Sequence, residues 1–551
     1  MATPAIRAEA SSDEPLPVRG HIDRPHGSEL LPRGPVVIRG WALGLTSRVS
    51  RVEARVDGRL HGYAGLGRVR SDVAAVLEDA EGELSGFELR FDGRAPDLRA
   101  DRACLLVRVT LCDGTAAEFP PIDVAFAPRT ASSAVSGPDR RRRSWSAGAA
   151  ARMAFRKVRL LCVARSLDCG GSQLRLKELV EHLHARSRFA CTVVAPSDGP
   201  LRGDLEAAGA AVRVQPLPVH DAGAYDAAMS GLEEWAAGRF DLVLAATLSS
   251  FPAVELAERL GVPSVYRIGE IEPLASVASW LSETLHPAIE ARAEGALDRA
   301  TLLLFNSEAA RRTHRQRGGM QACEVIPSSV DVAGARAFAS STDRAACRER
   351  LGFAPDRRVV VCAGTIWPVK GQALLVWALE QLRHVHPSLA CVLVGQQFDP
   401  YAEALGRYVV RHDLEEQVRL VPFTDDLRPW LHAADIAACP SESESMPASV
   451  LEAMAFGVPI LAARVGGVPE AVQDGASGWL FPPSDLGALV AALDRAARAS
   501  PAELRALGDG ALRAVAAAHD RRHALPRAAT LLWRVARSRR AATGSGDTIG
   551  S

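Results

Sequence analysis

Short runs of alternating apolar and polar residues fill residues 18–126 of the chain. In residues 86–93, for example, Phe87, Leu89 and Phe91 stand at every second position before an Asp-Gly pair. Period-two alternation that ends in Asp-Gly indicates strands joined by tight hairpin turns. About seven such runs in this stretch predict an antiparallel β-sandwich of immunoglobulin-like type.

After residue 158 the pattern changes to uninterrupted apolar runs separated by segments of helical period, such as 171–186, 372–384 and 448–456. Apolar runs without alternation are typical of parallel strands that are buried on both faces. A strandless, helix-prone break at 328–351 divides them into two groups, which predicts two Rossmann-like α/β domains facing a cleft. The predicted strands are 158–164, 190–195, 241–247, 263–268, 300–305, 358–364, 390–395, 418–423, 435–440 and 459–465.

Between these two regions the composition shifts to Ala, Ser, Gly and Arg. Such a segment buries too little apolar area to offset its ordering entropy, which favours a flexible linker. Its basic run admits a second interpretation as a peripheral tether to anionic lipid at the inner face of the membrane. The run consists of Arg140, Arg141, Arg142 and Arg143 and is followed by Ser144 and Trp145.

The composition mainly excludes certain locations, partners and kinds of site. Lys plus Arg and Asp plus Glu both total 65 in the 551 residues, so no net charge supports nucleic-acid binding. The first residues lack the apolar core of a secretion signal, and no stretch approaches the roughly 20 apolar residues of a membrane span, so we expect a cytoplasmic protein. The ten cysteines show no metal-ligand spacing, and we expect no metal or other cofactor. Six of them lie in strand-like runs and are predicted to be core residues: Cys104, Cys162, Cys191, Cys362, Cys391 and Cys439.

Two loops carry candidate anion-binding residues. Gly170 and Gly171 follow the first predicted parallel strand and precede a helix, where backbone N–H groups and the helix dipole favour a diphosphate. Lys370 lies in the loop after the strand 358–364, at the edge where α/β sheets bind ligands. A simple turn and an exposed loop lysine are the alternative interpretations.

The most informative segment is 435–459, in which Glu444 lies in a loop and Glu452 lies eight positions later, on the following helix. Two carboxylates near one helix start suit a ligand with vicinal hydroxyls, such as a nucleotide sugar. Pro447 fits the first turn of that helix and leaves the N–H groups of Ala448 and Ser449 available to phosphate. The alternative is that Glu442 and Glu444 are surface loop acids and that Glu452 is an acid at the helix start that complements the helix dipole.

Several ordered motifs together resemble the retaining GT-B glycosyltransferases of family 4, over about residues 158–540. They comprise Gly170-Gly171, 306–308 (Asn-Ser-Glu), 325–331 (Val-Ile-Pro-Ser-Ser-Val-Asp), Lys370-Gly371, the Glu444 to Glu452 spacing with its following Ala-Met-Ala-Phe-Gly-Val-Pro, 466–470 (Gly-Gly-Val-Pro-Glu) and 474–480 (Asp-Gly-Ala-Ser-Gly-Trp-Leu).

This resemblance implies a sugar transfer from a UDP-, GDP- or ADP-linked donor to a glycan, lipid-linked or other hydroxyl acceptor, with retention of configuration, in polysaccharide or glycoconjugate biosynthesis. It implies that Lys370 stabilises the donor diphosphate, that Glu444 contacts the transferred sugar and that Glu452 contacts the ribose. It further implies that Gly170 and Gly171 lie over the diphosphate. It implies that the stretch 446–449, with Pro447 at the helix start, presents the backbone N–H groups of Met446, Ala448 and Ser449 to phosphate or sugar.

The resemblance also divides the chain. The expected parts are a tail at 1–15, a β-sandwich accessory domain at 16–127, a linker at 128–157, an acceptor domain at 158–335, a donor domain at 336–524, a helix crossing back to the acceptor domain at 525–540, and a tail at 541–551. Within the sandwich, Trp41 is expected to pack in a core strand, and a sugar-stacking platform is the alternative.

Two positions depart from the family pattern. Thr365 stands where an arginine is frequent, so one diphosphate cation is missing unless Arg165, Arg267 or another residue replaces it. Gly269 stands where a histidine facing the sugar is frequent, and Glu270 directly follows it as a candidate contact. These departures support a second hypothesis, a catalytically weak GT-B protein that binds a nucleotide sugar or glycan. A non-hydrolysing epimerase would need an acid and histidine constellation that the sequence does not show.

Overall fold

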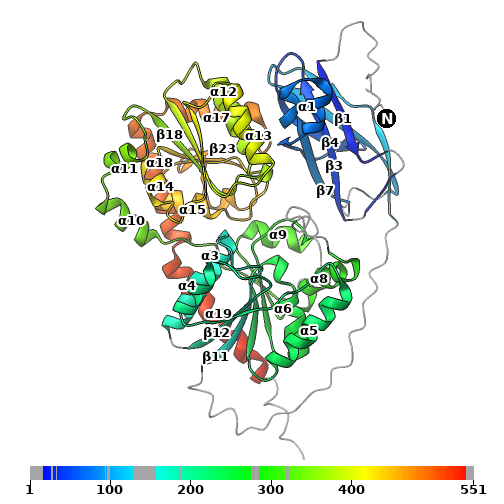
Figure 1. The fold of residues 1–551 in the computed structure, drawn as a ribbon, viewed down its shortest axis with the longest axis vertical. Coiled ribbons are helices and arrows are strands. Elements are labelled where there is room, and N and C mark those ends of the chain that lie inside the picture. The colour runs from blue at the N-terminus through cyan, green and yellow to red at the C-terminus, as the bar shows by residue number, and fades with distance from the viewer. Residues whose placement is uncertain are drawn as a thin grey trace, which may run out of the picture. The chain divides into compact units, whose positions relative to one another are not determined.

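A computed structural model describes residues 17–541, apart from residues 27–28, 33, 94, 96–97, 99, 128–156, 187, 275–276, 278–284 and 317–321. The chain forms two compact units, each built from two separate segments (Figure 1). One comprises Met1–Ser133 with Val330–Ala518, and the other comprises Ala134–Ser329 with His519–Ser551. The basic run 140–143 lies outside the described residues.

The N-terminal part of the first unit, here called the β module (residues 18–126), contains two antiparallel sheets in the orders β1-β3-β7-β6 and β2-β10-β8-β4-β5, with β9 paired to β8. Phe87, Leu89 and Phe91 are all buried, as the alternation predicted. The elements are β1 (Val18–Arg24), β2 (Leu30–Leu31), β3 (Pro35–Gly44), β4 (Val49–Val56), β5 (Arg59–Tyr63), β6 (Gly65–Arg68), α1 (Ser71–Leu77), η1 (Ala80–Leu84), β7 (Gly86–Asp92), β8 (Arg102–Leu111), β9 (Ala116–Glu118) and β10 (Ile122–Phe126).

The module has more strands than the roughly seven expected from alternation. β2 and β9 hold only two and three residues, which is too short for a period-two pattern to be recognised. β2 also pairs in parallel with β10, and hairpin signals do not predict such a pair. Trp41 lies on β3 and is only partly buried, whereas its neighbour Ala42 is in the core.

The C-terminal sheet domain of the same unit (residues 330–518) is a parallel sheet in the order β20-β19-β18-β21-β22-β23. The strand order reverses between β18 and β21, and ligands bind at such a switch point in open α/β sheets. Its elements are α10 (Val332–Ser341), α11 (Arg344–Arg350), β18 (Arg358–Ala363), η3 (Pro368–Lys370), α12 (Gln372–Leu382), β19 (Leu389–Val394), α13 (Tyr401–Arg411), β20 (Val418–Val421), α14 (Arg428–Ala433), β21 (Ile436–Cys439), α15 (Ala448–Ala455), β22 (Ile460–Ala463), α16 (Val468–Ala471), β23 (Gly478–Phe481), α17 (Leu486–Arg498) and α18 (Pro501–Ala518).

The second unit is a parallel sheet in the order β13-β12-β11-β14-β15-β16-β17 with helices on both faces (Figure 1). One face packs against α3, α4 and the last helix α19, and the other packs against α5, α6 and α8. Its elements are β11 (Val158–Val163), α3 (Gly171–Ala185), β12 (Phe189–Ala195), α4 (Leu201–Ala207), β13 (Ala211–Val214), α5 (Ala222–Ala236), β14 (Leu242–Ala245), η2 (Leu248–Ser250), α6 (Pro252–Leu260), β15 (Ser264–Ile268), α8 (Pro287–Arg299), β16 (Leu302–Phe305), α9 (Glu308–Gln316), β17 (Cys323–Val325) and α19 (Arg521–Ala541).

All ten predicted parallel strands coincide with observed strands, but β13, β17 and β23 were not predicted. β13 and β17 are edge strands of three or four partly exposed residues, so they lack the continuous apolar run of a central strand. β23 is a four-residue strand in a glycine-containing stretch that resembles a loop. Edge position and short length therefore explain the three omissions.

Burial of the cysteines corrects one expectation. Cys162, Cys191, Cys362 and Cys391 are buried, as is Cys439, but Cys104 is exposed. It lies on the outward face of β8, where its neighbour Leu105 faces the core. In an alternating strand the apolar character of a run does not fix which face a given residue takes.

Among the described residues, no helix combines the length and apolar content needed to cross a bilayer.

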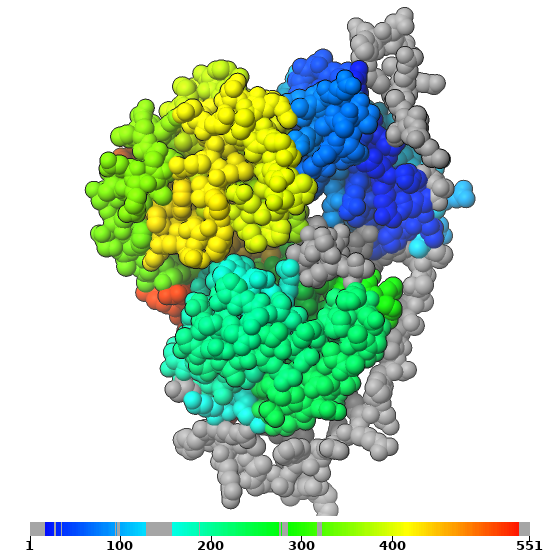
Figure 2. Space-filling model, in the orientation of Figure 1, coloured from blue at the N-terminus to red at the C-terminus, as the bar shows by residue number. Residues whose placement is uncertain are grey.

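The β module and the C-terminal sheet domain contact each other through ion pairs (Figure 2, blue and yellow-green). Arg68 pairs with Glu442, and Arg407 pairs with Glu83 at 2.7 Å. Arg51 reaches Asp485 at 3.3 Å, next to a hydrogen bond from the Gly487 N–H to the Ser50 hydroxyl. These pairs, together with a shared apolar core, join the module to the domain within the first compact unit.

Candidate functional site

Lys370 and Glu444 contact each other directly. The Nζ of Lys370 donates to Oε1 of Glu444 at 2.6 Å, and the Ser441 hydroxyl donates to the same oxygen at 2.8 Å. The Lys370 side chain is 33% exposed and that of Glu444 is 11% exposed. A lysine ammonium carries three N–H donors, so this contact leaves Lys370 able to donate to an anion as well.

Lys370 and Glu444 meet because β18 and β21 are neighbouring parallel strands. The loop with Lys370 follows the carboxyl end of β18, and the loop with Glu444 follows that of β21. Gly371 has φ +70°, and a Cβ there would lie 2.2 Å from the carbonyl oxygen of Pro440. The Glu442 N–H also donates to the Val369 carbonyl at 2.9 Å. Gly371 therefore lets the loop after β21 approach the loop that carries Lys370. This approach brings Lys370 next to Glu444.

Gly371→Ala is expected to destabilise the first unit by about 2–4 kcal/mol, because an alanine must hold a left-handed backbone and displace a carbonyl group. Urea unfolding monitored by circular dichroism measures this change. Gly406→Ala is the matched control: Gly406 lies in α13 with no neighbouring atom within 4 Å of a new Cβ, and alanine there should stabilise by about 0.5–1 kcal/mol. Equal effects of the two substitutions would contradict this explanation of Gly371.

The electrostatics favour a charged lysine at this position. Burial acts to lower the pKa of Lys370, but the charge and hydrogen bond of Glu444 outweigh it and raise that pKa above 10.5. Behind the pair, burial raises the pKa of the Cys439 thiol to about 11, so the cysteine is a neutral thiol at physiological pH. The cation is therefore Lys370, and Cys439 is no nucleophile there.

Helix α15 begins directly after this loop. Pro447 is its N-cap residue and makes no side-chain cap hydrogen bond, so the first N–H groups of the helix, including those of Ala448 and Ser449, point out of its end. Met446 is buried beneath the turn, with 6% of its side chain exposed. Glu452 lies one turn into the helix and is partly buried. The predicted residues of this segment thus share one loop and one helix start.

Thr365 lies two residues beyond β18, and its carbonyl accepts a hydrogen bond from Nε2 of Gln372 at 2.8 Å. Its backbone therefore has a structural role in closing the loop that contains Lys370.

Among the described residues, no group of three or more His, Cys, Asp and Glu side chains is arranged to hold a metal ion.

In the second unit, Gly170 is the N-cap residue of α3 and Gly171 is its first residue. A Cβ on Gly170 would lie 2.5 Å from Oε1 of Gln173, whereas a Cβ on Gly171 would meet no atom within 4 Å. At Gly170 the end of the Gln173 side chain, which bonds the Ser166 hydroxyl, would have to move. At Gly171 no atom would have to move, so packing does not explain that glycine and approach of a ligand remains its predicted reason.

Gly171→Ala is expected to leave the stability of the second unit unchanged or slightly increased, because alanine is the better helix residue and meets no atom. The rate of donor turnover should fall about 10- to 100-fold, because the methyl group shifts a diphosphate held by the helix start. Thermal unfolding and steady-state kinetics measure the two effects. Gly203→Ala, at an equally open glycine in α4, is the control: it should raise stability slightly, as at other open helical glycines, and leave the rate of donor turnover unchanged.

Glu270 lies just beyond β15, where its carboxylate accepts hydrogen bonds from the N–H groups of Leu248 at 3.2 Å and Gly269 at 2.9 Å. The two hydrogen bonds act to lower the pKa of the Glu270 carboxyl, but burial outweighs them and raises that pKa. Burial and the charge of Arg175 lower the pKa of Arg267 nearby. A Cβ on Gly269 would meet Nδ2 of Asn306 at 3.4 Å, an ordinary contact, so packing does not require the glycine.

Sequence reasoning missed three residues near the Lys370–Glu444 pair. Ser441 bonds Glu444 directly, Glu442 was considered only as a surface acid, and Arg68 of the β module pairs with Glu442. Ser441 could have been found from its position three residues before Glu444. Arg68 had no such signal, because 374 residues separate it from its partner.

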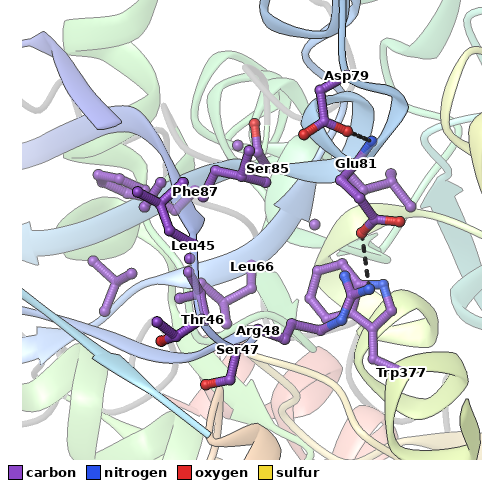
Figure 3. A pocket seen from close by; sticks show the side chains of 18 residues that line it. Leu45, Thr46, Ser47, Arg48, Leu66, Asp79, Glu81, Ser85, Phe87 and Trp377 are labelled. Atoms are coloured by element: carbon purple, nitrogen blue, oxygen red, sulfur yellow. Dashed lines mark hydrogen bonds and ion pairs between the residues drawn. The ribbon is translucent and has the colours of Figure 1, made fainter. Parts of the chain in front are cut away.

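A separate cavity of about 340 Å³ lies between the β module and α12, and none of the predicted site residues lines it (Figure 3). Arg48 crosses it, with its guanidinium 5.0 Å from the ring centre of Trp377. Arg48 also donates to Glu81 at 2.9 Å and to the Tyr408 hydroxyl at 2.5 Å. The polar groups at this cavity thus bond largely to one another across the contact between module and domain.

Comparison with known proteins identifies the class. A crystal structure of Anabaena Alr3699/HepE in complex with UDP and glucose superposes with a TM-score of 0.59, at 24% identity, and covers 68% of this chain and 99% of that one. The two parallel Rossmann-like sheets therefore define a GT-B fold, to which this chain adds N-terminal antiparallel sheets. The family described as "Glycosyl transferase 4-like domain" matches residues 170–328, and "Glycosyl transferases group 1" matches residues 357–499. The chain belongs to the group 1 glycosyltransferases of family 4.

Curated relatives match over part of their length. The D-inositol 3-phosphate glycosyltransferase of Segniliparus rotundus is 30% identical over 270 residues, which cover 46% of this chain and 57% of that protein. The GDP-mannose-dependent alpha-(1-6)-phosphatidylinositol monomannoside mannosyltransferase of Mycolicibacterium smegmatis is 38% identical over 188 residues, which cover 32% of this chain and 47% of that protein. The chain thus spans about half the length of these relatives.

Proposed function

We propose that this protein transfers a sugar from a nucleotide-sugar donor to a hydroxyl group of a glycan or lipid-linked acceptor, with retention of anomeric configuration. The bond between the sugar C1 and the diphosphate oxygen breaks, and the acceptor oxygen bonds to C1. The hydroxyl proton leaves with the nucleoside diphosphate. The family resemblance supports a place in polysaccharide or glycoconjugate biosynthesis. The two sheets of the β module support an immunoglobulin-like class for it.

The observation that carries the proposal is the contact between Lys370 and Glu444 beside the start of α15. A fixed cation and a helix N-terminus stabilise the charge that develops on a departing diphosphate. The partly buried Glu444 carboxylate beside them is proposed to accept hydrogen bonds from sugar hydroxyls, and Glu452 on α15 is proposed to do so for a ribose. Gly170, Gly171 and Glu270 are proposed to contribute from the second unit.

Two similar proteins indicate that UDP- and GDP-sugars are the donors to test first. Alr3699/HepE is described in complex with UDP and glucose, and the mycobacterial relative is named as GDP-mannose-dependent. Release of free nucleoside diphosphate from a panel of UDP-, GDP- and ADP-sugars, with and without membrane lipid extract as acceptor, tests the proposal. Turnover of one nucleotide class is the expected result. If no donor is hydrolysed and none raises the melting temperature, the proposal fails.

A second candidate function, binding of a nucleotide sugar without efficient transfer, is favoured by Gly269. The space beside Asn306 admits a side chain, yet the chain has a glycine where related enzymes often have a histidine. A donor that raises the melting temperature but is not turned over with any acceptor would support this candidate.

A further inference from the structure

Strand β6 of the β module lies directly against the loops of the candidate site. A Cβ on Gly65 would lie 2.0 Å from Oε2 of Glu442, and a Cβ on Gly67 would lie 2.9 Å from Cβ of Ala373 in α12. A side chain at Gly65 would displace the Glu442 carboxylate, and one at Gly67 would meet Ala373 while holding a left-handed backbone. The two glycines in this four-residue strand thus let its backbone contact the C-terminal sheet domain at Glu442 and at α12.

Arg68 at the end of β6 holds the Glu442 carboxylate with two parallel hydrogen bonds, from Nη1 to Oε1 at 2.8 Å and from Nη2 to Oε2 at 2.6 Å. Both side chains are only 17% exposed. Burial acts to lower the pKa of Arg68, and the charge of Glu442 outweighs it and raises that pKa. A two-pronged, largely buried pair fixes position as well as charge.

The backbone around Glu442 connects the Arg68–Glu442 pair to the Lys370–Glu444 pair. Its N–H bonds the Val369 carbonyl, next to Lys370, and Glu444 follows two residues later. Glu444 in turn accepts from Lys370 and Ser441. An arginine of the β module is therefore linked to the site pair through one loop, residues 441–445.

We propose that Arg68 is a positioning residue for the nucleotide-sugar site, which it serves by holding loop 441–445 through Glu442. The β module is then a structural part of the donor site and not an independent appendage. The role in donor binding rests on the proposed function, whereas the hold on the loop does not.

Arg68→Ala leaves the Glu442 carboxylate in the contact without its cation, so that group is expected to take up a proton or to pull the loop toward water. A shift of about 1 Å at a catalytic group reduces rates up to 100-fold. We therefore expect kcat/KM for the donor to fall about 10- to 100-fold, with Arg68→Lys intermediate because lysine keeps the charge but not the two-pronged geometry.

Two comparisons separate this role from general stability. Arg407→Ala removes an ion pair to Glu83 that crosses the same contact but ends on α13, away from the loop, and it should leave the kinetics unchanged. Arg68→Ala combined with Glu442→Ala should lose no more activity than Arg68→Ala alone, because both changes act on one interaction. Additive losses, or equal losses in Arg407→Ala, would overturn the proposal.

Hydrogen exchange followed by mass spectrometry tests the hold on the loop without any donor. Amides of residues 441–445 should exchange at least about tenfold faster in Arg68→Ala and Arg68→Lys than in wild type, and should be unchanged in Arg407→Ala. Unchanged exchange in folded Arg68 variants refutes the proposal. Faster exchange in a protein that turns over no nucleotide sugar would retain the hold on the loop and refute only the function assigned to the site.

Discussion

Replacing Lys370 with alanine is expected to reduce release of nucleoside diphosphate about 100- to 1000-fold, because the fixed cation that stabilises the departing diphosphate is lost. The fold should persist, since the side chain is 33% exposed and Ser441 still bonds Glu444. Steady-state kinetics with the donor found in the panel measure the loss, which should fall mainly on kcat because charge develops as the bond breaks.

Lys177→Ala provides the matched control. Lys177 lies on α3 and pairs with Asp204 at 3.0 Å and with Glu181 at 3.6 Å, so its removal also deletes one lysine together with its ion pairs. Its kinetics should equal those of wild type. An active Lys370→Ala protein, or an equal loss in Lys177→Ala, would remove the role assigned to Lys370.

Glu444→Ala is expected to reduce turnover by a similar factor and to add a new dependence on pH. In the wild-type protein Glu444 keeps the pKa of Lys370 above its ordinary value of 10.5, so the lysine is charged throughout the working range. Without Glu444, burial acts alone and lowers that pKa. The cation is then lost at a lower pH than in the wild-type protein, so residual turnover should fall on the alkaline side, where wild-type turnover stays constant.

Glu444→Gln separates the two effects, because the amide keeps a hydrogen-bond acceptor but removes the charge. It should show the same alkaline loss as Glu444→Ala with a higher turnover at pH 7. A flat pH profile in both variants would show that Glu444 does not govern the charge of Lys370. Thermal melting at each pH confirms that the proteins remain folded.

The sequence allowed prediction of the parallel sheets and of the loops that carry Lys370 and Glu444. Central strands such as β18 and β21 show continuous apolar runs because both faces are covered, and that signal is local. Since both residues follow such strands, their order along the chain placed them at one sheet edge. The contact between them follows from the strand order, in which β18 and β21 are neighbours.

The contacts of the β module could not be predicted in this way. Arg68 resembles any arginine at a strand end, and only the folded chain brings it to Glu442. Glycines such as Gly65 and Gly67 are ambiguous in a sequence, because a turn, a bulge and a close approach of two backbones all favour them. Cys104 shows the same limit on a smaller scale, since facing outward on β8 depends on register.

The place of α19 in the second unit has a consequence for biosynthesis. Leu532, Val535 and Ala536 of this helix complete a core begun by Leu160 and Leu179, more than 350 residues earlier in the chain. The first unit likewise joins the β module to residues that follow Val330. During translation, neither unit can therefore complete its core when its first segment leaves the ribosome, and the earlier sheet presents an uncovered apolar face until the last helix is made. We therefore expect the nascent chain to bind chaperones until α19 has been made.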